Sequence, residues 1–415
     1  MITRVQEQTP VISRVRVKNF GSIEDVDVKL GQLTVLVGKN GSGKSTFLEA
    51  LSFLRDAIKP GVGLEAAIAS RNGLSYIRRK VSGVDVHNIE IIVTVEAKDL
   101  WAEYGFILNT DGMVSSIRSP KDTRSDTSKV FRIVREFCQL GKNQLDAELE
   151  FEIEEGEWKT QPHNPFVMDK TKRADMKLDK NQLFLPVLAV LQPDITNLVH
   201  HLTASMFYTL YPDALGGFQA DMMAYALLEN GNNLASVLRR IEQEMPKRDL
   251  VSILTHVIAD IAEIKVVPVG SFLLVKVLHR TNAGAVWLDI GQESDGTKRL
   301  LFLLVALYQG GLLELLAIEE PEIALHPGAL DVLSDVLHEA SLIYQILITT
   351  QSPDLISQFS PDELRVVERI DGTTRISPLE DRQIDAINEE LFSAGDLLRI
   401  EGLRPADEMA DAANA

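Results

Sequence analysis

Several features that mark specialised classes of protein are scarce or missing in this sequence. The single cysteine, Cys138, cannot form an internal disulfide, which predicts a protein of a reducing compartment. No run of about 18 or more apolar residues occurs, and residues 1–8 lack the apolar segment of a signal peptide. We therefore expect a cytoplasmic protein without a membrane span.

Basic residues are also in deficit. The chain has 42 Lys and Arg against 60 Asp and Glu, giving a formal net charge of −18. This excludes a surface coated in basic residues for nucleic acid, although a local basic groove stays compatible with it. The short basic segments 78–80, 118–124 and 170–173 are candidates for contact with a phosphate backbone. Few aromatic residues accompany them, so solvated loop charge is the interpretation we favour.

Metal-binding and repeat signatures are missing as well. No Cys/His cluster with metal-ligand spacing occurs, and the adjacent pair His200–His201 is more typical of a helix surface than of a metal site. The sequence contains no internal repeat and no long heptad run. These absences argue against a zinc domain, a solenoid and a long coiled coil.

What the sequence does contain is a complete phosphate-binding loop. Residues 38–45, GKNGSGKS, fit G-x-x-x-x-G-K-[ST]; an apolar segment, 33–37, precedes them and a helical pattern follows. Glycines allow backbone N–H groups to point at phosphates, and the following helix adds a favourable dipole. Lys44 would reach the β- and γ-phosphates of a nucleotide, and the Ser45 hydroxyl would bind Mg²⁺. We assign ATP contacts to Gly38, Asn40, Gly41, Ser42, Gly43, Lys44, Ser45 and Thr46.

Hydrophobic periodicity predicts an α/β chain with four consecutive parts. Strands are predicted at 12–20, 23–30, 84–96, 149–154, 264–278 and 285–290, and helices dominate from 186 to 262. We expect an N-terminal lobe with an antiparallel β subdomain at 1–180, and a helical insertion with returning strands at 181–290. A C-terminal α/β lobe at 291–378 and an acidic tail at 379–415 follow.

A second group of polar residues follows an apolar run in the C-terminal lobe. The run ends on Glu319 and Glu320, which is how buried parallel strands deliver carboxylates to a site. We assign Glu319 to the Mg²⁺ ion, through a direct or a water-bridged contact, and Glu320 to the role of general base or water-orienting group. The alternative is a solvated helix cap after a core strand.

Two further segments complete this candidate site. Ser294, Asp295 and Gly296 open an apolar helix, whose N-terminus would face an anion unless it is an ordinary capping turn. Gln351 ends another buried strand, and it either contacts a γ-phosphate or caps the helix that follows Pro353.

The order of these motifs resembles that of the ABC-type ATPases of the SMC/RecF/OLD group, in particular their short stand-alone members. The resemblance covers nearly the whole chain. Beside the motifs already named, the segments VKNFGS at 17–22, SDGT at 294–297, LHP at 325–327 and GNNL at 231–234 are similar to segments of that group.

The resemblance implies an ABC-ATPase-like P-loop NTPase head, with a mixed central sheet, an antiparallel β lobe and a helical insertion. It implies that two heads sandwich two ATP molecules, with Ser294 and Gly296 of each head contacting the γ-phosphate bound by the other. Mg²⁺-dependent hydrolysis would then loosen the dimer.

The sequence departs from the pattern of the group at two positions. Gln351 stands where the group often has histidine, and an amide can only form hydrogen bonds, so it cannot carry a proton. Glu319 stands where aspartate is more usual. The glutamine of the Q-loop has two candidates, Gln182 and Gln192, which the sequence does not separate.

The resemblance also directs the expected function. About 60 residues follow the segment 351–353, which is too few for the Toprim nuclease domain of other members, so another chain would carry out any cleavage of nucleic acid. We expect a head-to-head homodimer or higher oligomer, a separately encoded effector such as a nuclease, DNA as a further candidate partner, and no membrane. The setting that the resemblance suggests is prokaryotic antiphage defence or DNA repair.

Two other interpretations stay open. A nucleotide-gated scaffold would bind ATP, oligomerise and hold an effector with little turnover, and Gln351 is the residue that favours it. The ATPase subunit of a transporter is disfavoured by the degenerate signature at 294–297 and by the strand-rich insertion before residue 180.

Overall fold

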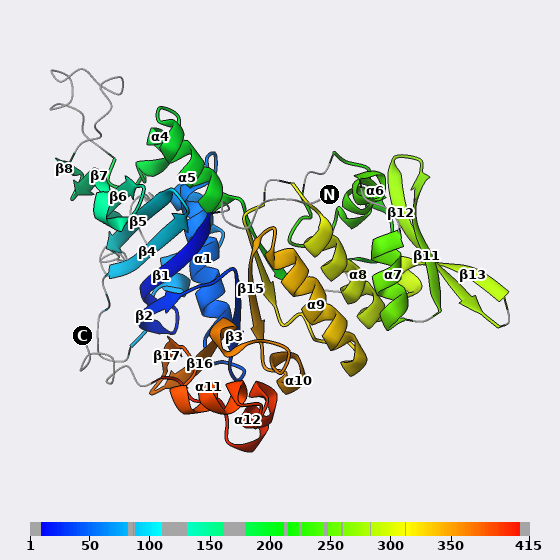
Figure 1. Ribbon diagram of the computed structural model, residues 1–415. Coiled ribbons are helices and arrows are strands. Elements are labelled where there is room, and N and C mark those ends of the chain that lie inside the picture. Colours follow the sequence, from blue (N-terminus) through cyan, green and yellow to red (C-terminus); the bar gives the residue numbers. More distant parts are fainter. Residues whose placement is uncertain are drawn as a thin grey trace, which may run out of the picture. The chain divides into compact units, whose positions relative to one another are not determined.

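The computed structural model describes residues 10–81, 86, 88–109, 131–160, 179–210, 215–223, 226–244, 248–258, 260–282, 284–311 and 313–406. These residues form two compact units (Figure 1). The first unit takes its residues from 1–31, 38–205 and 366–377, and the second from 32–37, 206–365 and 378–415. The units are therefore interleaved along the chain, and the four consecutive segments expected from the sequence stay a prediction.

The first unit is built on a mainly antiparallel sheet. Its strands are β1 (Val11–Phe20), β2 (Ile23–Lys29), β4 (Asn88–Ala97), β5 (Leu100–Asn109), β6 (Arg132–Gly141), β7 (Glu148–Glu154), β8 (Glu157–Thr160), β16 (Leu364–Ile370) and β17 (Thr373–Ser377). They follow the order β8-β7-β6-β5-β4-β1-β2-β17-β16, and β17 runs parallel to β2. In β1 the side chains of Val15 and Val17 are buried while Arg14 and Arg16 lie outward, as the alternation of the sequence predicts.

Helices cover the apolar face of this sheet. They are α1 (Lys44–Ile58), α2 (Gly63–Ala69), α3 (Leu74–Ile77), α4 (Leu185–Leu188) and α5 (Pro193–Thr203). Helix α1 packs on β1 (Figure 1), and its Phe53 ring lies 5.8 Å from that of Phe20 and 6.3 Å from that of Phe106. Burial of each such ring contributes roughly 1.5–3 kcal/mol, so the helix that carries the phosphate loop is firmly attached to the sheet.

The second unit contains the parallel strands. They are β3 (Leu33–Val37), β14 (Leu315–Glu319) and β15 (Gln345–Thr350). Strand β9 (Ser205–Thr209) lies beside β14, in the order β3-β15-β14-β9. Strands β3 and β15 are buried along their whole length, which is typical of parallel strands covered on both faces. The accompanying helices are α8 (Asp295–Tyr308), α9 (Leu330–Ser341), α10 (Pro353–Ile356), α11 (Asp381–Asn388) and α12 (Ala394–Ile400).

A smaller antiparallel sheet also belongs to the second unit. It consists of β10 (Gln219–Ala220), β11 (Ile261–Val269), β12 (Phe272–Thr281) and β13 (Gly284–Asp289), with helices α6 (Leu234–Glu244) and α7 (Arg248–Val257) beside it.

The fold class expected from the sequence is confirmed, and two of its details are wrong. The strand expected at 264–278 is the hairpin β11–β12, because Gly270 at φ 62° turns the chain. Strands β9 and β10 interrupt the region expected to be helical, since such short segments do not separate a helical period from a strand period. No helix in the described part of the chain is long and apolar enough to cross a membrane.

Candidate functional site

The phosphate loop encloses its own lysine. Lys44 is buried at the start of α1, and its Nζ donates to the carbonyl oxygens of Gly38, at 2.6 Å, and Lys39, at 3.2 Å. Gly41 and Gly43 have φ of 77° and 109°, which favour glycine. No described side chain caps the first turn of α1. The loop therefore presents backbone amides and an ammonium group, which suit an anion.

Strand β17, which is distant in the sequence, contacts and stabilises the phosphate loop. The buried Thr374 hydroxyl donates to the Ser42 carbonyl at 2.9 Å, and it lies 2.7 Å from the Ser22 hydroxyl. A Cβ atom on Gly43 would overlap the Thr374 side chain, so this glycine is needed for space as well as for its backbone conformation. From the sequence, an ATP contact is assigned to Thr46. In the structure its hydroxyl accepts a hydrogen bond from the Ser22 hydroxyl at 3.3 Å.

A basic hollow of about 470 Å³ adjoins the loop in the first unit. Tyr76, Arg78, Lys80 and Arg369 are among its lining residues, and Tyr76 is 70% exposed. The Nη1 atom of Arg369 lies 3.5 Å from the Gly41 carbonyl, which fixes the hollow beside the phosphate loop. One of the three basic segments of the sequence, 78–80, is thus part of this surface, while 118–124 and 170–173 lie outside the described residues.

Three parallel strands of the second unit end at one edge. Val37 of β3 pairs with Thr350 of β15, and Thr349 of β15 pairs with Glu319 of β14. The phosphate loop begins at the residue after Val37. This edge of the second unit therefore carries Glu319 at the end of β14, Glu320 directly after it, and Gln351 after β15.

The backbone of Glu320 is strained at this edge. Its φ is 43°, in the left-handed region that residues other than glycine enter at a cost. Its N–H donates to the Thr349 carbonyl at 2.9 Å and contacts the Thr349 hydroxyl at 3.2 Å, which holds the unusual conformation. Both Glu319 and Glu320 are half-buried. Strain of this kind is concentrated at functional sites.

A third carboxylate, missed by the sequence reasoning, connects the two strand ends. Glu322 Oε1 accepts hydrogen bonds from the Thr350 hydroxyl, at 2.5 Å, and from the Gln351 N–H, at 3.4 Å. Its Oε2 is buried and has no hydrogen-bond partner among the described residues. Burial raises the pKa of Glu322, and these hydrogen bonds oppose that effect. In the sequence, Glu322 could have been recognised as the third acid of the segment EEPE, at 319–322.

The predicted signature segment also belongs to the second unit. Ser294 is exposed and caps α8, accepting from the Thr297 N–H at 3.2 Å. A Cβ atom on Gly296 would lie 2.6 Å from the Ala324 carbonyl, so the start of α8 packs closely on the loop that follows β14. Gly296 thus lies near the loop that follows β14 and contains Glu320 and Glu322. The phosphate loop belongs to the first unit.

Comparison with known proteins assigns the family. A family model described as "AAA domain, putative AbiEii toxin, Type IV TA system" matches residues 33–357, most of the chain. The chain belongs to this family. The match confirms the resemblance to ABC/SMC-like ATPases without a long coiled coil, and this AAA family is one of P-loop NTPases.

Individual relatives of this AAA protein are distant or partial. The OLD nuclease of Thermus scotoductus is 42% identical over 52 residues, 12% of this chain and 10% of that protein, so the chain spans about a tenth of this curated relative. The SMC head domain from Thermotoga maritima is 11% identical over 89% of this chain and 99% of that chain, with a TM-score of 0.44. The Smc head with an extended coiled coil, bound to the C-terminal domain of ScpA, from Pyrococcus furiosus is 15% identical over 92% and 99%, with a TM-score of 0.48. The fold described above rests on the strand order of this chain.

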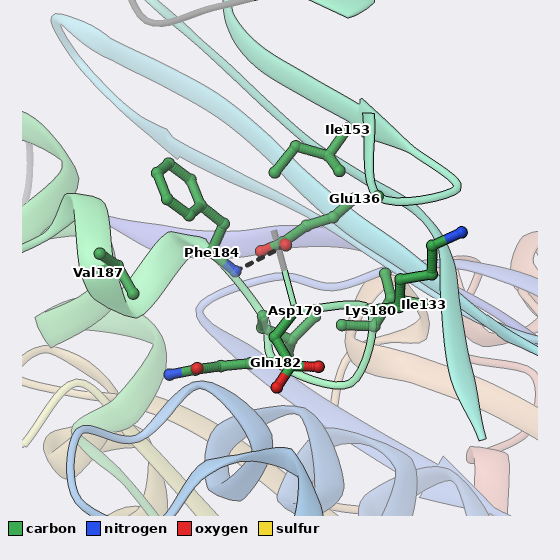
Figure 2. Close-up of a pocket in the computed structure, with 10 residues that line it drawn as sticks. Ile133, Glu136, Ile153, Asp179, Lys180, Gln182, Phe184 and Val187 are labelled. Atoms are coloured by element: carbon green, nitrogen blue, oxygen red, sulfur yellow. Dashed lines mark hydrogen bonds between the residues drawn. The ribbon is translucent and has the colours of Figure 1, made fainter. Parts of the chain in front are cut away.

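A second hollow of the AAA protein, about 260 Å³, lies in the first unit (Figure 2). The Glu136 carboxylate points from β6 at the segment that enters α4, and accepts from the N–H groups of Phe184, at 2.7 Å, and Leu185, at 2.9 Å. It also accepts from the Tyr104 hydroxyl at 3.0 Å. Burial raises the pKa of Glu136 to about 7, against the lowering effect of these bonds. We interpret this cluster as an anchor of the fold.

The two candidates for the glutamine of the Q-loop differ in exposure. Gln182 is exposed at the rim of the second hollow, and Gln192 is buried at the start of α5. In the pair assigned to a helix surface, His200 is exposed and His201 is buried on α5.

Proposed function

We propose that this AAA protein is an Mg²⁺-dependent ATPase whose ATP-bound heads dimerise and thereby control a partner. The observation that carries the proposal is the buried Lys44, whose ammonium group donates to the carbonyl oxygens of Gly38 and Lys39 within the phosphate loop, at the uncapped start of α1. The phosphate loop would bind the triphosphate, and the hollow beside Arg369 would take the base and ribose.

Four residues, Ser45, Glu319, Glu320 and Gln351, would supply the chemistry of hydrolysis. The Ser45 hydroxyl and the Glu319 carboxylate are oxygen donors of the kind that Mg²⁺ prefers, and we assign both to it. Bound Mg²⁺ would neutralise charge on the phosphates. The strained Glu320 would orient the attacking water or accept its proton, while Gln351 would donate a hydrogen bond near the γ-phosphate.

Dimerisation would complete each site from two chains. The exposed Ser294 and the N-terminus of α8 would contact the γ-phosphate bound by the partner head, so loss of that phosphate would loosen the pair. A separately encoded effector such as a nuclease, or DNA, would respond to this cycle. Antiphage defence or DNA repair is the setting we propose, in the cytoplasm.

The alternative is a nucleotide-gated scaffold that oligomerises with little turnover. Gln351 favours it, because an amide cannot relay a proton from the reaction.

The test compares native protein with Glu320→Gln and Lys44→Ala. We expect native protein to hydrolyse ATP, Glu320→Gln to bind ATP without turnover and to double its mass in light scattering, and Lys44→Ala to lose ATP binding. Retained affinity in Lys44→Ala would refute the assignment of the loop. A Glu320→Gln protein that stays monomeric with ATP would refute the sandwich, and ATP binding without turnover by native protein would favour the scaffold.

A further inference from the structure

A histidine lies between two carboxylates beside the signature segment. His279 of β12 has its Nδ1 atom 2.9 Å from Asp260 Oδ2 and its Nε2 atom 2.8 Å from Glu293 Oε1. The side chains of His279 and Glu293 are 12% and 4% exposed, so the second contact is shielded from water. Both ring nitrogens therefore face an acceptor.

This geometry selects the charged form of the ring. A neutral imidazole has one N–H group and can donate to one of the two carboxylates, whereas imidazolium donates to both. Burial lowers the pKa of His279, but the hydrogen bonds and charges of Asp260 and Glu293 outweigh it and leave the pKa raised. Within the described part of the chain, these two carboxylates are the charged groups that act on the ring.

Glu293 leads directly into the signature segment. The next residue, Ser294, caps α8, and the preceding turn, Ile290–Gln292, is closed by a capping box from Asp289. The Glu293 N–H donates to the Ile290 carbonyl at 3.2 Å. His279 of strand β12 therefore holds Glu293, the residue before the N-cap of α8. Movement of Glu293 would displace Ser294 and Gly296, which follow it in the chain.

We propose that His279 is a positioning residue: by bridging Asp260 and Glu293 it holds the signature segment in the orientation that the partner head requires. The proposal rests on the proposed function, because it gives the signature segment its role in ATP-driven dimerisation. It adds a residue from the antiparallel sheet, outside all of the motifs of the nucleotide site.

The sign of the pH dependence follows from the raised pKa. The imidazolium bridge is complete below the pKa of the ring and is lost as the pH rises through it. ATP-driven association should therefore weaken with rising pH, and its midpoint should coincide with the titration of His279.

The experiment measures ATP-dependent association by light scattering from about pH 6 to about pH 9, in the Glu320→Gln background. We expect association to fall about tenfold across this range. The His279→Gln variant should associate weakly throughout and lose the pH dependence, while Glu293→Gln should move the midpoint to lower pH. His200→Gln, a change at an exposed histidine of α5, is the matched control and should keep the profile.

A titration of the His279 ring by nuclear magnetic resonance without ATP separates the two proposals. A pKa that is raised in the parent and falls in Glu293→Gln supports the bridge even if the heads do not dimerise, in which case the sandwich is the part that fails. An unshifted pKa overturns the bridge, and so does an unchanged association profile in a folded His279→Gln protein. Should His279→Gln not fold, the Glu293→Gln midpoint decides.

Discussion

At the scale of single residues, the phosphate loop depends on a hydroxyl that is 332 positions away in the sequence. Thr374 donates to the Ser42 carbonyl and fills the space that a side chain at Gly43 would need. Without that hydroxyl the carbonyl would lose a buried donor, at a cost of about 1–3 kcal/mol. The shape of the loop is therefore determined by β17 as well as by its glycines.

Replacing Thr374 tests this role. We expect Thr374→Val, which keeps the shape and removes the hydroxyl, to weaken ATP binding about tenfold in calorimetric titration. Thr374→Ser keeps the donor and should bind nearly as native protein does. Equal affinity of Thr374→Val and native protein for ATP would show that the hydrogen bond from Thr374 does not order the phosphate loop.

At the scale of elements, Glu136 attaches the start of α4 to the sheet of the first unit. Its carboxylate has three donors, yet burial raises its pKa from 4.5 to about 7. The ionised form is thus penalised in the folded state. The free energy of unfolding should fall as the pH rises from the ordinary carboxyl pKa to about 7, by up to about 3 kcal/mol.

Substitution by glutamine separates this contribution from the rest. Glu136→Gln cannot ionise, so its stability should be flatter between about pH 4.5 and pH 7 in denaturant titrations. Glu154→Gln, a change at an exposed residue of β7, should keep the native dependence of unfolding free energy on pH. If Glu136→Gln also keeps that dependence, Glu136 is not its source.

At the scale of the whole molecule, the proposed sandwich makes a prediction about mixtures. If each site joins the loop of one head to the signature of the other, Lys44→Ala and Ser294→Arg chains are inactive alone. Half of the pairs in an equal mixture then contain one chain of each kind, and these pairs have one intact site. We expect the mixture to recover up to about a quarter of the native ATPase rate.

The mixture also distinguishes the sandwich from sites that work within one chain. A mixture that remains inactive while mixed dimers form would contradict a shared site. Activity of Ser294→Arg alone would show that the signature segment does not contact the nucleotide.

The sequence by itself determined the local parts of this protein. The phosphate loop at 38–45, strands β1 and β2, and the acids at the end of β14 are each encoded within a short segment of the chain, so spacing and periodicity predict them. The AAA family match confirms the class that these motifs suggested. The site residues themselves stay predictions for the variants above to test.

The tertiary structure decided which distant segments meet. Thr374 lies beside Ser42, Glu322 joins Thr350, and His279 bridges Asp260 to Glu293. The physical reason is that such contacts depend on the order of strands in a sheet and on the register of their pairing. Local periodicity shows which face of a strand is buried, but it contains no information on which strand lies next to it.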